Sequence, residues 1–265
     1  MEPSGASQTR KDGDVRMSHF SVGVICESLS DVERLLAPYD ENIEVEQYVS
    51  RTKAELIKEG KNVKRRLLAD DKDEHTSDEW ALKYLNAETD EDFYNAERYA
   101  DSEYDEDGNE LTTYNPKSKW DWYSIGGRWS GELRLKEEDE DRYSYCDGAK
   151  IKDIDFSPDK EKYDECYKWW KEKVEGSDEE WDSFYKKSYF TERYRDAEEY
   201  ATRSARFTTF ALVTPDGEWH ECGEMGWFGF SSDTPDEARE WDEQYMSFIE
   251  NADPEYYFVM VDCHI

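Results

Sequence analysis

The sequence lacks several features that would assign it to a common class of protein. Its 265 residues contain no run near the roughly 18 apolar residues that a membrane-spanning helix needs, and no hydrophobic signal region follows Met1. The five cysteines are odd in number and form no CxxC pair, which favours a reducing, cytoplasmic setting. The motifs GxxxxGK[ST], GxGxxG and GxSxG are absent, which argues against the common nucleotide-binding and hydrolase classes.

Histidine is also scarce. The chain has four, and none lies in an HExxH or similar metal-binding motif. Glu103, Asp105 and Asp107 partly match the ligand spacing of an EF-hand loop, but Tyr114 stands where a bidentate Glu is needed. We therefore interpret Asp107-Gly108-Asn109 as a solvated hairpin turn, and we expect neither a metal nor a cofactor.

What the sequence has in excess is negative charge. Asp and Glu number 67 against 34 Lys and Arg, which gives a formal net charge of −33. Disordered acidic tails are poor in aromatic residues, whereas this chain has 10 Trp, 19 Tyr and 11 Phe, so we expect a folded aromatic core. An acidic coat of this kind repels nucleic acid and acidic membranes and attracts basic protein surfaces.

Alternating apolar residues and turn signals predict a set of strands. The last strand has apolar residues on both faces, which is typical of a central strand. Thr214-Pro215-Asp216-Gly217 and Ile125-Gly126-Gly127 are turn signals between neighbouring strands. No regular βαβ alternation links the strands, so we expect a mainly antiparallel sheet. The predicted strands are residues 18–26, 120–123, 128–135, 207–213, 218–222 and 256–264.

Capping signals and a helical period predict helices between these strands. Thr234, Pro235 and Glu237 combine an N-cap, an N1 proline and an N3 carboxylate. We expect an α+β fold in which acidic, aromatic-rich helices pack on or beside the sheet. A flexible leader, 1–16, would precede a single domain, 17–265, with translation starting at Met1 or Met17. The predicted helices are 30–36, 52–68, 77–99, one from Ser157 through Val174, one from Ser177 to about Tyr189, and one from Pro235, and the acidic helical insertions are about 52–110 and 137–200.

Five segments of unusual composition follow one another along the chain. They are MSHF from Met17, APYDEN from Ala37, KWDWYSIGGRW from Lys119, GEMGWFG from Gly223 and VDCHI from Val261. Together, and in this order, they resemble a family of uncharacterised proteins found mostly in bacteriophages and prophages. The resemblance implies a phage or prophage origin, and therefore a host-directed role in the cytoplasm of the host cell. It implies no particular activity, and the residues before Met17 depart from the family's usual start.

His19, Asp262 and His264 are candidate catalytic residues. Asp262 and His264 are two residues apart on a predicted strand, so their side chains share one face, and His220 and Cys222 have the same spacing on another strand. If the strands are neighbours, these residues would converge on a metal or an acid–base pair. Polar ends of edge strands also explain the spacing without any metal.

Arg128 lies in a glycine- and tryptophan-rich motif that allows two interpretations. Gly126 and Gly127 would let the backbone turn with positive φ. The guanidinium of Arg128 would then pair with Asp121 as a buried structural staple. Alternatively, Arg128 would hold a small anion or nucleotide in a pocket. The candidate pocket residues are Asp121, Trp122, Arg128, Trp129, Glu224 and Trp227.

The acidic segments suggest a binding function. From Asp70 to Glu110, 17 acidic residues accompany three basic ones. Helical carboxylates three or four positions apart lie roughly 5–6 Å from one another, a spacing similar in scale to that of phosphates on nucleic acid. Most such faces are only solvated, but the excess is beyond the roughly 2–8 charges that solubility needs.

We therefore expect a DNA-mimic-like inhibitor rather than an enzyme, which blocks a basic nucleic-acid-binding site on a host defence protein such as a nuclease. It would contact neither nucleic acid nor membrane directly. The alternative is a small-molecule, nucleotide or metal-dependent site in the glycine- and tryptophan-rich motifs. The expected partner-binding residues are Asp70, Asp71, Asp73, Glu74, Glu91, Asp92, Asp101, Asp105, Glu106, Asp107, Glu179 and Glu180.

Overall fold

The computed structural model has a mixed α+β fold with mostly antiparallel sheets, as the sequence predicts. It describes residues 19–69, 78–136, 144–176, 186–223 and 234–265. The expected leader, 1–16, and most of the helix expected from Ser177 lie outside these residues. The described residues divide into two compact units. We call Glu41–Pro116 the inserted unit, and the residues before Glu41 together with those after Pro116 the sheet unit.

The sheet unit is built on one sheet in which the two ends of the described chain pair with each other. The strand order is β10-β9-β1-β11-β5, and β8 pairs with the first half of β11. All pairs are antiparallel except that of β1 with β9. A separate small pair, β6 with β7, lies in the same unit. The strands are β1 (His19–Cys26), β5 (Trp122–Ile125), β6 (Leu133–Arg134), β7 (Tyr145–Cys146), β8 (Gly148–Lys150), β9 (Ala211–Val213), β10 (Trp219–Glu221) and β11 (Tyr257–His264).

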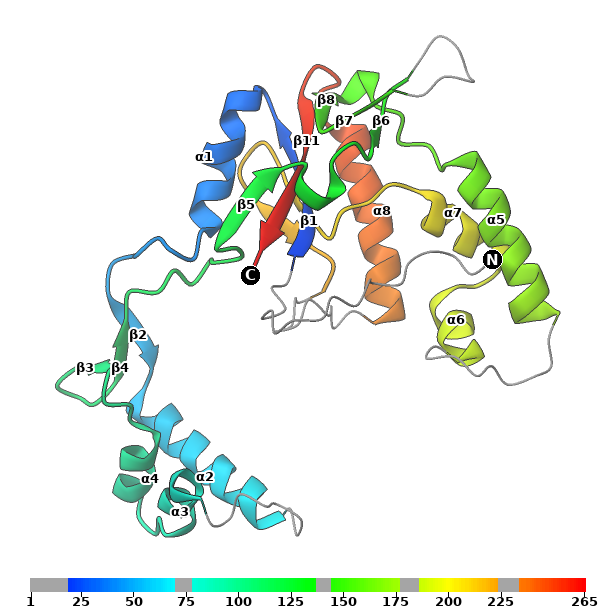
Figure 1. The fold of residues 1–265 in the computed structure, drawn as a ribbon. Helices are drawn as coiled ribbons and strands as arrows, with labels where there is room; N and C mark the ends of the chain where they lie inside the picture. The colour runs from blue at the N-terminus through cyan, green and yellow to red at the C-terminus, as the bar shows by residue number, and fades with distance from the viewer. Residues whose placement is uncertain (1–18, 70–77, 137–143, 177–185, 224–233) are drawn as a thin grey trace, which may run out of the picture. The chain divides into compact units, whose positions relative to one another are not determined.

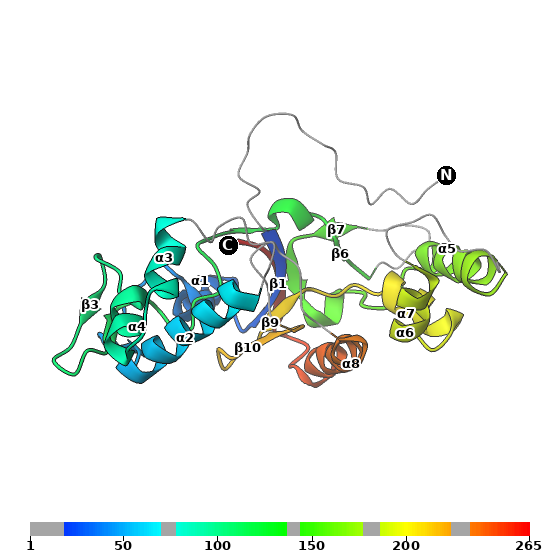
Figure 2. The same ribbon diagram turned by 90° about the horizontal axis from the view of Figure 1, so that it is seen from below.

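The last strand is central and covered on both faces, as predicted. On one face, Val22 of β1 and Val261 of β11 pack with Leu35 of helix α1 (Val32–Leu36). On the other, Phe258 and Met260 of β11 pack with the long helix α8 (Pro235–Asn251). Figures 1 and 2 show α1 and α8 on opposite sides of β1 and β11.

Helix α8 begins where its sequence signals predict. The hydroxyl of Thr234 accepts the backbone N–H of Glu237, and the carboxylate of Glu237 accepts the backbone N–H of Thr234. Pro235 occupies the first turn. Its inward residues, Trp241, Tyr245 and Ile249, are buried against the sheet. The predicted hairpin turn before β10 is also present, with Gly217 at φ 87°.

Three more helices of the sheet unit lie side by side in both views (Figures 1 and 2). In the first of them, Trp170 is buried with Val174 of the turn that follows and with Ala197. That helix begins after Asp159, whose side chain caps Lys162, and not at Ser157 as predicted. The helices are α5 (Lys160–Trp170), which continues as a π-helical turn Lys171–Glu175, α6 (Lys187–Arg193) and α7 (Ala197–Ala205).

Other predicted boundaries in the sheet unit are wrong. The predicted strand 128–135 is a 3₁₀ turn, Gly127–Trp129, followed by the two-residue strand β6. The predicted strand 120–123 begins later, at Trp122, where pairing with β11 starts. The first helix is capped one turn early, because Ser28 and Asp31 form the capping box of a 3₁₀ turn that precedes α1.

The inserted unit contains three helices and a small sheet among its described residues. The predicted helix 77–99 is two helices, because Thr89 and Asp92 form a new capping box in its middle. The predicted turn before β4 is confirmed, since the Asp105 carboxylate accepts the backbone N–H groups of Asp107 and Asn109. Its elements are β2 (Tyr48–Arg51), α2 (Lys53–Ala69), α3 (Glu79–Leu85), α4 (Asp90–Glu97), β3 (Glu103–Tyr104) and β4 (Glu110–Thr112), with strand order β2-β4-β3.

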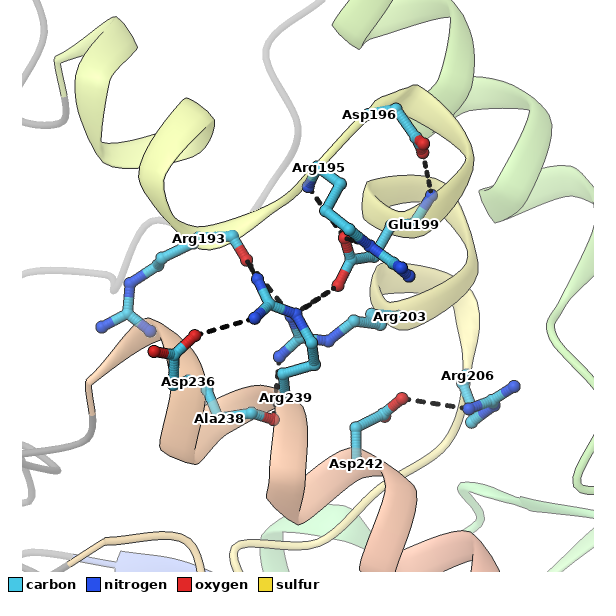
Figure 3. Close-up of polar contacts among 10 residues, drawn as sticks. All are labelled: Arg193, Arg195, Asp196, Glu199, Arg203, Arg206, Asp236, Ala238, Arg239 and Asp242. Carbon is cyan, nitrogen blue, oxygen red and sulfur yellow. Dashed lines mark hydrogen bonds and ion pairs between the residues drawn. The ribbon is translucent and has the colours of Figure 1, made fainter.

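A buried carboxylate joins α7 to α8. Glu199 accepts hydrogen bonds from the Nε atoms of Arg195 at 2.9 Å and Arg239 at 3.0 Å, and Arg203 lies 3.6 Å away (Figure 3). Burial by itself raises the pKa of Glu199, but the donors on Arg195 and Arg239 outweigh it and lower the pKa from 4.5 to about 2. The cluster therefore fixes the first turns of α8, which covers the sheet.

We predict that Glu199→Gln destabilises the sheet unit by about 1–3 kcal/mol at pH 7, since it removes the anion that bonds to the partly buried side chains of Arg203 and Arg239. A carboxyl whose pKa is lower in the folded state stabilises fully above pH 4.5, and that contribution disappears as the pH falls toward 2. The variant should therefore lose the part of the pH dependence of stability that Glu199 contributes in this window, measured by urea unfolding. Glu198→Gln, at an exposed neighbour, is the control; an equal loss in both variants would contradict the assignment.

Candidate functional site

One face of the sheet changes from apolar to polar along its strands. In β1, Ile25 and Gly23 are followed toward the chain start by Ser21 and His19, and in β11 Phe258 and Met260 are followed by Asp262 and His264. The antiparallel register places His19 opposite His264 and Ser21 opposite Asp262. Pairing with β5 adds Trp122 beside His264 and Ser124 beside Asp262. Two rows of polar side chains therefore cross three strands at one end of the sheet.

The first acid–base pair joins β1 to β11. Nδ1 of His19 lies 2.8 Å from Oδ1 of Asp262, whose side chain is almost fully buried. The other oxygen of Asp262 accepts the backbone N–H of Arg128 at 3.0 Å. Because both oxygens are engaged, Asp262 is held fixed and orients the imidazole of His19.

The second pair joins β11 to the residue before β5. Nδ1 of His264 lies 2.5 Å from Oδ1 of Asp121, and the backbone carbonyl of His264 accepts the N–H of Asp121. His264 is 8% exposed, and its Nε2 is a buried atom for which the described residues provide no hydrogen-bond partner. The imidazole rings of His19 and His264 are 5.1 Å apart at an interplanar angle of 74°. We call His19, Asp121, Trp122, Asp262 and His264 the His–Asp site.

Trp122 forms one side of the His–Asp site. Its ring centroid lies 6.0 Å from that of His19 and 6.4 Å from that of His264, with edge-to-face geometry in both cases. Trp122 is nevertheless 51% exposed, so part of the indole is open to solvent beside the two imidazoles. An exposed aromatic ring at a polar cluster is a surface on which a ligand can pack.

The two glycines after β5 allow the backbone to approach the site. Gly126 and Gly127 have φ of 70° and 53°, in the region that glycine adopts without strain. A Cβ on Gly127 would collide with the side chain of Asp262, and a Cβ on Gly126 would collide with that of Asp147. The carboxylate of Asp147 in turn accepts the N–H of Gly131 and the hydroxyl of Ser130. The turn thus rests between two carboxylates.

The structure brings together the three candidate catalytic residues, His19, Asp262 and His264. Asp121 and Trp122, nominated for the pocket, join them. His220 does not, because its ring packs on Phe248 and its Nε2 lies 3.4 Å from Thr214.

Arg128 and Trp129, also candidates for the pocket, lie outside the His–Asp site. Arg128 is exposed and the Asp121 carboxylate pairs with His264, so the expected buried Arg128–Asp121 staple is wrong. The side chain of Trp129 packs against the core cluster under α8. Glu224 and Trp227 lie outside the described residues.

Some polar residues around the site carried no signal of their own in the sequence. Ser21 accepts the backbone N–H of Phe210, and Ser124 and Asp147 lie beside the glycine turn. Serines and an aspartate at such positions are common on any surface. Their proximity follows from the pairing of β11 with strands far away in the chain, which local patterns do not contain.

The acidic residues expected to bind a partner have mixed roles. Asp92 caps α4, Asp105 holds its own turn, and Glu91 lies 3.1 Å from Lys53. The remaining described ones, Asp101, Glu106 and Asp107, are exposed, and their carboxylates have no ion-pair partner among the described residues. Asp70, Asp71, Asp73, Glu74, Glu179 and Glu180 lie outside the described residues.

In the part of the chain that the structure describes, the two histidines lack the third ligand that a zinc site needs. Two imidazoles oriented by carboxylates resemble half of a zinc site, but catalytic zinc sites have three protein ligands. Among the described residues, no group of three His, Cys, Asp or Glu side chains is placed to hold a metal ion.

The described helices include none that is both long and apolar enough to cross a membrane.

Comparison with known proteins adds no assignment. No protein-family model, curated protein or solved structure matches this chain. The geometry of the site and the charge of the chain remain as the evidence on function.

We predict that Gly127→Ala disrupts the His–Asp site. The new methyl group must displace Asp262, and a residue other than glycine in this left-handed conformation costs a further 1–2 kcal/mol or so. Gly131→Ala is the matched control, because Gly131 has a φ of 75° but open space around its Cβ position. Urea unfolding and the NMR signals of the His19 ring should change more in the first variant. Equal effects would show that backbone strain alone matters there.

Proposed function

We propose that the His–Asp site binds a small ligand and exchanges a proton with it. The observation that carries the proposal is the pairing of two adjacent imidazoles, His19 and His264, each with its own carboxylate. In each neutral ring, an Nδ1–H that donates to a carboxylate leaves Nε2 as a proton acceptor. A positioned imidazole of this kind is the commonest general base in enzymes.

The unpaired Nε2 of His264 favours a ligand over a purely structural role. Leaving a buried polar atom without a hydrogen bond costs about 1–3 kcal/mol. Most buried polar groups in folded proteins avoid this cost by bonding to protein, to an ordered water or to a ligand. A ligand group that bonds to Nε2 of His264 would recover the lost free energy.

The origin of the chain bears on this proposal. Three of the five segments that carry the resemblance to phage and prophage proteins supply residues of the His–Asp site, namely those that contain His19, Trp122 and His264. We therefore propose a phage-type protein that acts in the cytoplasm of a host cell.

The first experiment determines which nitrogen of each histidine carries the proton. With only four histidines in the chain, long-range proton–nitrogen NMR spectra can resolve each ring. We predict that the neutral rings of His19 and His264 are protonated on Nδ1. Asp262→Asn should change the signals of His19, and Asp121→Asn those of His264. Neutral rings of the parent protein whose proton is on Nε2 would contradict the proposal.

The same samples serve for a thermal-shift screen with small molecules. A ligand of the His–Asp site should bind at least tenfold more weakly, a loss of about 1.4 kcal/mol, to His19→Gln and to His264→Gln. His220→Gln is the matched control, because His220 lies on β10 with partners of its own. Ligands whose affinity is the same in all three variants would not occupy this site.

A second candidate function is the binding of a basic protein partner. The net charge of −33 and the exposed carboxylates of Asp101, Glu106 and Asp107 favour it. In this proposal, an acidic surface that includes the inserted unit blocks a nucleic-acid-binding site on a host defence protein, as a DNA mimic does. Such recognition is electrostatic, so it accelerates association and weakens with salt.

A pull-down from host lysate at low and high salt tests this second function. We predict that the parent protein captures a basic protein at low salt and loses it at high salt. The triple variant Asp101→Asn, Glu106→Gln, Asp107→Asn should capture less. A triple change at Glu41, Glu44 and Glu46, also in the inserted unit, controls for net charge. Partners that are acidic or that persist at high salt would refute electrostatic mimicry.

A further inference from the structure

We infer that the ligand of the His–Asp site is a small organic cation with a primary ammonium group, held against Trp122. This inference rests on the proposed function and narrows it to one ligand class. It follows from three independent properties of the site: the type of hydrogen-bonding atoms, the local charge and the exposed indole.

The hydrogen-bonding atoms that the two histidines and the two aspartates offer to a ligand are acceptors. The Nδ1 atoms of His19 and His264 are engaged by Asp262 and Asp121, which leaves the Nε2 atoms as acceptors in the neutral rings. Carboxylates accept but do not donate when ionised. A ligand that complements this set must therefore supply donors, and an ammonium group has three donors and no acceptor.

The local charge selects against anions. Asp121 and Asp262 lie in the site, and Asp147 lies on the other side of the glycine turn. The side chain of Arg128 is exposed, and its backbone N–H is already bonded to Asp262. The net charge of −33 adds a long-range field that concentrates cations and repels anions.

The indole of Trp122 completes the site. Tryptophan is the aromatic ring that attracts cations most strongly, and Trp122 is 51% exposed beside both imidazoles. We place the ammonium against this indole, whose neighbours are the imidazole rings of His19 and His264, with centroids at 6.0 and 6.4 Å. This assignment replaces the sequence-based alternative, in which Arg128 holds an anion or a nucleotide.

The test compares three probes with one ring and different charged groups. Benzylammonium carries a positive charge and N–H donors, benzyltrimethylammonium carries the charge without donors, and benzoate is an anion. Adenosine monophosphate is added as a nucleotide probe. Each is titrated at constant ionic strength against sodium chloride, so that counterion effects of the acidic coat cancel. Melting temperature and the NMR signals of the histidine rings report binding.

We expect benzylammonium alone to give a saturable rise in melting temperature and to shift the signals of His19 and His264. Its affinity should fall at least tenfold in Trp122→Ala and in His264→Gln and recover in part in Trp122→Phe. Tyr99→Ala is the control, because it removes a ring that is 57% exposed in the inserted unit. This variant should bind benzylammonium with the affinity of the parent protein. Circular dichroism checks that each variant folds.

The outcomes separate the two proposals. A saturable response to benzoate or adenosine monophosphate that depends on His264 would overturn the cation assignment and leave the acid–base site in place. Equal responses to benzylammonium and benzyltrimethylammonium would show that donors are not recognised and would also overturn it. The absence of any saturable response would likewise overturn the cation assignment. The proposed function would then be tested by the NMR experiment alone, which shows which nitrogen of each ring carries the proton.

Discussion

The antiparallel pairing of β1 with β11 is the interaction on which the rest of the structure depends. It runs without interruption from His19 opposite His264 to Cys26 opposite Tyr257, and it joins the two ends of the described chain. The inner part of both strands is apolar on both faces and is covered by α1 and α8, whereas the outer part carries the His–Asp site. A slip of one residue would turn every side chain to the opposite face. Core and site are therefore fixed by the same register.

Much of this core could be predicted from local patterns. The first strand, the last strand, the hairpin before β10 and the helix after Thr234 all have strong signals, and all are present. The failures have two causes. The break at Thr89 depends on a side chain whose hydrogen bond competes with the regular helix. The 3₁₀ turn at Gly127 depends on positive φ at two glycines and on a hydrogen bond to the distant Asp262. Spacing along one strand nominated Asp262 and His264, but the partner of each histidine comes from a distant segment, which spacing cannot reveal.

The glycine and tryptophan motif shows how an unusual composition can reflect geometry. Gly126 and Gly127 are required because two carboxylates, Asp147 and Asp262, lie where their Cβ atoms would be. Trp122 and Trp129 then have opposite roles, the first exposed beside the imidazoles and the second packed against the core. The sequence interpretation placed Arg128 at the centre of this motif. The structure gives that place to the backbone N–H of Arg128, which any residue except proline would supply.

The acidic excess and the His–Asp site act over different distances. The field of the exposed carboxylates extends across the surface but is screened over about 8 Å in physiological salt, so it affects how often a cation arrives. The acceptors of His19, His264 and their carboxylates act only at hydrogen-bond distance, in a largely buried environment where salt has little effect. Rising salt should therefore slow the arrival of a cationic ligand more than it weakens the bonds that hold it. In this proposal the exposed carboxylates set how often a cation arrives, and the His–Asp site sets which cation stays bound. The two effects require no contact between the exposed carboxylates and the site.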